Sequence, residues 1–163
     1  MRLAGRVLCA VLLLALVMPH TASAADTFKP FTLKTLEGSQ RSLSDVLGKA
    51  TLVVFFYPTC PYCNAAFPEV QRIYTTYKDR GLSMVWINVI TDEEKLIADW
   101  QRSHGYTVPV LLGDRPLAMS YNLRMTPTHY LLDAKGQIIS SHAGYKAGDE
   151  KALEQAIQKA LGL

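Results

Sequence analysis

Two cysteines, Cys60 and Cys63, are separated by Pro61 and Tyr62 and follow the apolar run of residues 51–56. A short strand that runs directly into such a motif predicts that Cys60 lies at the start of a helix. Unpaired backbone N–H groups and a partial positive charge at that position stabilise a thiolate, which is the nucleophile in disulfide exchange. Cys63 follows one helical turn later on the same side. We therefore expect a redox dithiol, with Cys60 as the exposed attacking residue and Cys63 as the more buried resolving residue.

The composition indicates a globular chain without a nucleic-acid partner. Of the 163 residues, 49% are hydrophobic and 19% are charged, which is enough apolar content to build a core. The formal net charge is +3, and Arg2 and Arg6 supply two of those charges. The rest of the chain carries about +1 and has no basic cluster, which excludes an electrostatic nucleic-acid surface.

The N-terminus has the features of an export signal. Arg2 and Arg6 precede the apolar run of residues 7–18, and Ala22-Ser23-Ala24 supplies the small residues that a signal peptidase requires. We expect a signal peptide at residues 1–24, cleavage after Ala24 and a periplasmic location. An uncleaved leader that anchors the chain in the membrane is the alternative, although the run is shorter than the roughly 20 residues of a membrane span.

Removal of the leader changes the cysteine count. Cys9 lies inside the apolar run, so the mature chain would keep only Cys60 and Cys63. An exported protein whose only cysteine pair is a Cys-x-x-Cys motif has no framework of structural disulfides. The pair itself is then the redox centre.

Periodicity predicts one α/β domain over residues 25–163. A hairpin of residues 28–33 and 40–43 turns at Gly38. The chain then alternates strands and helices before ending in a hairpin and a final helix, which predicts a mixed central sheet with helices on both faces. The expected strands are residues 51–57, 82–90, 108–112, 128–133 and 137–142, and the expected helices are residues 61–80, 91–104, 115–121 and 149 onward.

These residues together resemble the thioredoxin superfamily, in particular its exported TlpA/ResA-like branch. The resemblance covers nearly the whole chain after the leader. It rests on Phe31 and Leu33 with Gly38 and Leu43, on the strand leading into Cys60-Pro61-Tyr62-Cys63 with Pro68 after it, on the segment of residues 88–112, and on residues 121–136 with Thr126-Pro127-Thr128. The resemblance implies a thioredoxin fold with an N-terminal β-hairpin and an inserted strand–helix segment.

The resemblance also implies roles for residues around the dithiol. Pro127 would be in cis and would lie against the cysteines, and the backbone of Thr126 would pair with a bound substrate strand. Pro61 and Tyr62 would form part of the surface that contacts the substrate. Neither a metal nor another cofactor is implied.

The function implied by the resemblance is exchange of electrons with a partner protein's disulfide or dithiol. Members of this branch receive electrons from a membrane thiol carrier and reduce partners such as apocytochrome c or copper-site cysteines, so we expect a reductant. The intervening Pro61-Tyr62 pair is instead the one found in glutaredoxins, whose potentials lie at roughly −200 to −230 mV. The sequence therefore leaves the physiological direction open.

One departure from the family pattern concerns the proton of Cys63. A buried carboxylate near the second cysteine lies six residues before the first cysteine in thioredoxin and three residues after the second in the ResA-like branch. Those positions are Val54 and Ala66 here, and Glu69 is the nearest acid in sequence. We expect deprotonation of Cys63 to depend on water or on a partner.

The residues also bear on two other functions, metal binding and peroxidase chemistry. Cys60, Cys63 and His129 could form a copper or zinc site, although a structural zinc site needs a fourth ligand. Peroxidase chemistry on this fold requires a Thr-x-x-Cys motif that follows a proline in a fixed pattern. Val53 and Tyr57 do not fit that pattern.

Overall fold

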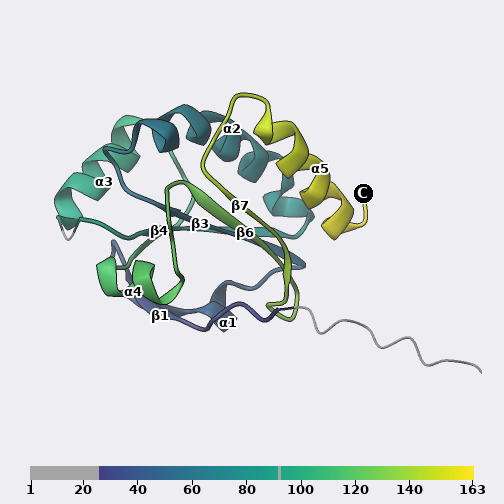
Figure 1. Cartoon of the computed structure of the whole chain (residues 1–163), viewed down its shortest axis with the longest axis horizontal. Helices are drawn as coiled ribbons and strands as arrows, with labels where there is room; N and C mark the ends of the chain where they lie inside the picture. The colour runs from purple at the N-terminus through teal and green to yellow at the C-terminus, as the bar shows by residue number, and fades with distance from the viewer. Residues whose placement is uncertain (1–25, 92) are drawn as a thin grey trace, which may run out of the picture.

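The computed structural model describes residues 26–91 and 93–163, which form a 7-stranded mixed sheet with helices on both faces (Figure 1). The expected signal peptide and its cleavage site lie outside these residues. The strands are β1 (Thr32–Thr35), β2 (Gln40–Ser42), β3 (Ala50–Phe56), β4 (Leu82–Asn88), β5 (Val110–Leu112), β6 (Thr128–Asp133) and β7 (Ile138–Ala143). The helices are α1 (Leu43–Val46), α2 (Pro61–Tyr77), η1 (Lys78–Arg80), α3 (Glu94–Ser103), α4 (Arg115–Ser120) and α5 (Asp149–Leu161).

The strand order is β2-β1-β5-β4-β3-β6-β7. β3 runs parallel to β4, and β4 runs parallel to β5, whereas β3 and β6 are antiparallel. Every residue of β3 is buried, because neighbouring strands flank it and helices cover both faces. This position explains its uninterrupted apolar sequence.

Alternate residues of β3 face two separate cores. Leu52, Val54 and Phe56 belong to the core under α2, α3 and α5, whereas Val53 and Phe55 belong to the core on the opposite face. In Figure 1 helices α2, α3 and α5 lie on one side of the sheet, and α1 and α4 lie on the other. The dithiol is therefore placed on the face that α2 covers.

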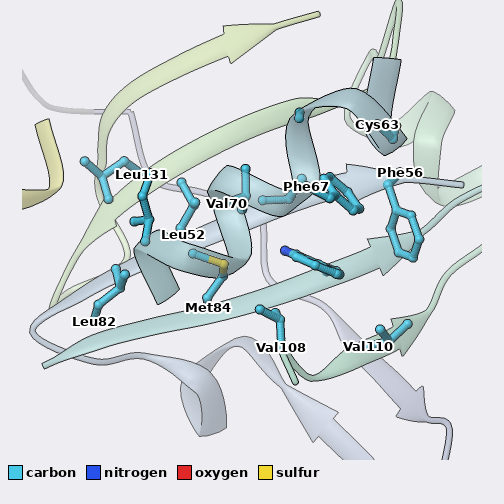
Figure 2. Packing of buried hydrophobic residues seen from close by; sticks show 14 of the residues in the cluster. Leu52, Phe56, Cys63, Phe67, Val70, Leu82, Met84, Val108, Val110 and Leu131 are labelled. Carbon is cyan, nitrogen blue, oxygen red and sulfur yellow. The ribbon is translucent and has the colours of Figure 1, made fainter. Parts of the chain in front are cut away.

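The core under α2 continues up to the dithiol. Figure 2 shows Cys63 in the first turn of α2, at the end of β3 marked by Phe56. Phe67 follows Cys63 one turn later and stacks on Trp86 with ring centroids 4.2 Å apart. Burial of these large side chains holds the N-terminus of α2 against the carboxyl end of β3.

The expected α/β class, element order and N-terminal hairpin are confirmed. β1 and β2 pair antiparallel, and Gly38 adopts a positive φ of 88° in the turn between them. Some boundaries were wrong: α2 ends at Tyr77 and continues as the 3₁₀ turn η1 before Gly81, which has φ of 109°. α3 begins at Glu94 rather than at residue 91.

Of the helices within residues 26–91 and 93–163, none has the length and apolar content needed to cross a membrane.

Candidate active site

Cys60 occupies the N-cap position of α2, as its sequence position predicts. Its backbone is extended, with φ of −74° and ψ of 114°, and Pro61 follows at the first helical position. Proline is suited to that position because the N–H group that it lacks would have no helical partner. The N–H of Cys63 donates a hydrogen bond to Cys60 Sγ over 3.2 Å. The sulfur is thus held by a backbone donor of the first helical turn.

The expected exposure of Cys60 is wrong, because the residue is only 1% exposed. The segment before β6 covers it: the Thr126 hydroxyl donates to Cys60 Sγ over 3.3 Å. The Cys60 thiol in turn lies 3.5 Å from the Thr126 carbonyl oxygen, to which it donates. A partner disulfide can therefore reach this sulfur only after a local rearrangement around Thr126.

Cys63 is fully buried, in agreement with the expected resolving position. Burial raises the pKa of its thiol well above the ordinary value, and the hydrogen bond with Cys60 raises this pKa further. The phenol of Tyr57 lies close enough to sense both sulfurs, and its pKa is raised by burial and by the thiolate charges. Cys63 is held as a neutral thiol at neutral pH, so its attack on a disulfide requires a proton acceptor.

The peptide bond between Thr126 and Pro127 is cis, as expected from the resemblance. Pro127 is buried, and the two hydrogen bonds between Thr126 and Cys60 place this segment against the dithiol. On the other side of the motif, Pro61 is exposed and Tyr62 is 63% exposed. The structure thus brings Thr126 and Pro127 to the cysteines and presents Pro61 and Tyr62 to solvent beside them.

Sequence reasoning missed Asn64, which fixes the loop that carries Cys60. The Asn64 side-chain Nδ2 donates to the Pro58 carbonyl oxygen over 2.9 Å, and its Oδ1 accepts from Trp100 Nε1 over 2.8 Å. Asn64 follows the second cysteine directly, and its two-sided donor and acceptor amide was the available signal. Trp100 packs in the core under α2, and its indole N–H has this additional partner.

The structure does not bring His129 together with Cys60 and Cys63 as a set of metal ligands. The register of His129 in β6 places it opposite Val54 of β3, two residues before the end of that strand. Among the residues that the structure describes, no three His, Cys, Asp or Glu side chains come together as ligands. His129 is instead a buried ring, and burial lowers its pKa from 6.5 to about 4, with the nearby His142 lowering it further and Asp149 opposing the shift.

No carboxylate occupies the positions at which the resemblance led us to look for one. Val54 of β3 and Ala66 of α2 are buried apolar side chains in the same core. Glu69 points to the protein surface, where it accepts a hydrogen bond from Arg72 over 2.7 Å, and Arg72 also bonds Glu154 of α5. The proton acceptor for Cys63 is therefore not Glu69.

Comparisons with known proteins identify what this arrangement is similar to. The sequence profile of the AhpC/TSA family matches residues 24–141. The thioredoxin-like protein YneN of Bacillus subtilis is 33% identical over 129 residues, which cover 78% of this chain and 74% of YneN. The thiol-disulfide oxidoreductase ResA of Halalkalibacterium halodurans is 27% identical over 125 residues, which cover 76% of this chain and 70% of that protein.

A solved structure shares the arrangement of elements. The crystal structure of a putative thiol:disulfide interchange protein DsbE from Chlorobium tepidum superposes with a TM-score of 0.73 at 26% identity. The match covers 85% of this chain and 97% of that one.

Proposed function

The chain belongs to the AhpC/TSA family and has the thioredoxin fold, and on that premise we propose that it is an exported thiol–disulfide oxidoreductase acting through Cys60 and Cys63. One observation carries the proposal: Cys60 Sγ, at the N-terminus of α2, accepts hydrogen bonds from the Cys63 N–H and the Thr126 hydroxyl. Donors at this position stabilise the negative charge that the attacking sulfur carries during disulfide exchange. The names of ResA and the DsbE-like protein describe the same chemistry.

Each cysteine has one role in the exchange. The Cys60 thiolate attacks one sulfur of the partner's disulfide, forms a mixed disulfide and releases the partner's other sulfur as a thiolate. Cys63 then loses its proton and attacks Cys60 Sγ, which forms the Cys60–Cys63 disulfide and releases the second partner thiolate. The partner gains two electrons, and the protein loses two.

The substrate would bind around the segment that covers Cys60. We assign substrate contacts to Thr126 and Pro127 on one side of the sulfur and to Pro61 and Tyr62 on the other. Tyr62 is 63% exposed, and Met125, which directly precedes Thr126, is 53% exposed. Exposed apolar side chains at this point provide a docking area for a protein rather than for a small polar molecule.

We propose that the protein works as a reductant. The donors to Cys60 Sγ are a backbone N–H and a hydroxyl, and burial keeps Cys63 neutral. Strongly oxidising couples of this type are those whose reduced form is specially stabilised. A neutral buried thiol and a thiolate without a cationic partner provide less of that stabilisation. Its substrates would be disulfides of exported proteins, such as those of apocytochrome c or copper sites, and its electrons would come from a membrane thiol donor.

The leader supports a periplasmic location for this chemistry. Residues 1–24 have the pattern of a cleaved export signal, and residues 25–163 would form the single thioredoxin-like domain that remains. The protein would contact the membrane through its electron donor, or through its own leader where the leader is not removed.

Reduction of insulin tests the proposed activity. Protein purified from the export fraction should accelerate the precipitation of insulin by dithiothreitol, and Cys60→Ser should abolish the acceleration. Activity retained in Cys60→Ser would contradict the assignment. N-terminal sequencing of the same material should find residue 25 first.

A further inference from the structure

A cavity of about 240 Å³ lies between the sheet, α2 and α5, and it begins at Ala66, one helical turn along α2 from Cys63. Its inner wall includes Ala66 of α2 and His129 of β6, and its mouth includes His142 of β7 and Asp149 of α5. His142 is exposed and pairs with Asp149, with 3.1 Å between Nε2 and Oδ2. The cavity therefore connects the buried face of α2 with ionisable groups at the surface, and its volume is sufficient for water.

His129 presents an unused polar atom in this region. Its ring is buried, and Nε2 has no hydrogen-bond partner among the described residues. A buried polar atom without a partner costs about 1–3 kcal/mol, so its retention calls for an explanation. The other buried polar side chains of the described residues are threonines and an asparagine, which do not exchange protons near neutral pH.

The position of His129 relates it to the resolving cysteine. Ala66 follows Cys63 by one helical turn, so the two side chains lie on the same face of α2. His129 lies opposite Val54 on the same core face, and it shares the cavity wall with Ala66. The ring thus lies on the core face to which Val54 and Ala66 also belong.

We propose that His129 accepts the proton of Cys63, through water in the cavity, when Cys63 resolves the mixed disulfide. The inference rests on the proposed dithiol exchange. In the step, the Cys63 S–H bond breaks and its proton passes to His129 Nε2. The Cys63 sulfur forms a bond with Cys60 Sγ, the bond between Cys60 Sγ and the partner sulfur breaks, and the partner leaves as a thiolate. Protonated His129 then releases its proton to solvent past His142 and Asp149.

The charges around His129 are consistent with transient protonation. Burial lowers the pKa of His129 to about 4 and raises that of Cys63, so each lone charge is unfavourable at neutral pH. Transfer from Cys63 to His129 creates the two charges together, and opposite charges within one core attract each other. The other ionisable groups on the cavity wall are His142, Tyr145, Asp149 and Glu150. The Asp149 carboxylate favours protonation of His129, and His142 opposes it.

The test separates the two chemical steps with an aryl disulfide. Reduced protein mixed with 5,5′-dithiobis(2-nitrobenzoate) should release one nitrothiobenzoate when Cys60 attacks and a second when Cys63 resolves. Cys63→Ser should give only the first release. In His129→Gln the second release should slow on the order of a hundredfold near neutral pH, whereas the first release keeps its rate. The difference should shrink at alkaline pH, where hydroxide replaces the missing base.

Control variants distinguish proton transfer from loss of structure. His104→Gln removes an exposed histidine of the same chain and should leave both releases unchanged. Ala66→Glu in the His129→Gln background places a carboxylate in the cavity and should restore most of the second rate. If His129→Gln does not fold, Ala66→Leu fills the space while His129 remains, and it should slow the second release in the same way.

Two results would overturn the inference, and a different one would overturn the proposed function. A second release in folded His129→Gln that matches wild type at every pH excludes His129, as does an unchanged second release in Ala66→Leu. Absence of any second release in the wild-type protein would instead contradict dithiol exchange itself.

Discussion

The hydroxyl of Thr126 donates a hydrogen bond to Cys60 Sγ over 3.3 Å, across a sequence separation of 66 residues. This contact joins the segment before β6 to the N-terminus of α2. It both supports negative charge on the attacking sulfur and covers that sulfur. The same residue pair therefore governs how reactive Cys60 is and how a partner gains access to it.

Replacement of Thr126 tests whether its hydroxyl supports negative charge on Cys60 Sγ. Thr126→Val preserves the shape of the side chain but removes the donor, and a hydrogen bond to a charged group is worth about 1.5–3 kcal/mol. Alkylation of Cys60 by iodoacetamide at mildly acidic pH should slow about tenfold or more. Thr126→Ser keeps a hydroxyl and should remain close to wild type. Equal alkylation rates in the valine and wild-type proteins would show that the hydroxyl does not support the thiolate.

Replacement of Cys63 by serine should trap the partner. Cys60 can still attack, but no thiol remains to resolve the mixed disulfide, so a covalent complex should accumulate in cells that produce the variant. Nonreducing electrophoresis of the exported fraction, followed by mass spectrometry, would detect it. Cys60→Ser is the matched control and should trap nothing; complexes of equal amount in both variants would indicate unspecific oxidation.

Much of this site follows from local sequence. The apolar residues 51–56 predict the buried strand β3, and the spacing of Cys60 and Cys63 places the dithiol at the start of α2. The cis bond before Pro127 follows from the resemblance. These features depend on residues that are close together in the chain or on a recognised pattern.

The burial of Cys60 could not be predicted in the same way. It depends on the contact with Thr126, which only the pairing of β6 with β3 brings into place. The orientation of His129 likewise depends on its register opposite Val54, since a shift of one residue would turn its ring to the other core. The hydrogen bonds of Asn64 join α2 to α3 and to the loop at Pro58, and no local pattern indicates their partners.

Asn64 should support both stability and rate. In Asn64→Ala the Trp100 indole N–H loses its acceptor and the Pro58 carbonyl loses its donor, so unfolding free energy should fall by about 1–3 kcal/mol. Urea unfolding measures this change, and insulin reduction at a temperature where the variant is folded measures the rate. Asn64→Asp keeps the acceptor for Trp100 and should lose less stability; no change in either variant would show that the two bonds are not needed.

The buried His129 should make the protein less stable in acid. Its pKa is about 4 in the folded protein against 6.5 for the ordinary side chain, so the unfolded chain binds the proton more strongly. Its contribution to stability is therefore fully present above pH 6.5 and is lost as the pH falls from 6.5 towards 4, by about 3 kcal/mol in total.

Unfolding by urea across this pH range measures that loss. The slope of stability against pH should flatten in His129→Gln, whereas His104→Gln, at an exposed position, should keep it. An unchanged slope in His129→Gln would mean that the ring is not held neutral by burial.

The reduction potential of Cys60 and Cys63 tests the central claim most directly. It is measured from the thiol content of the purified protein after equilibration in glutathione buffers of graded ratio, with Cys60→Ser as the control for unspecific thiols. A reductant acting through this pair should titrate as one two-electron couple near or below about −250 mV. A potential above about −150 mV would make the protein a disulfide donor, and a pair that does not titrate as a two-electron couple would contradict the dithiol account.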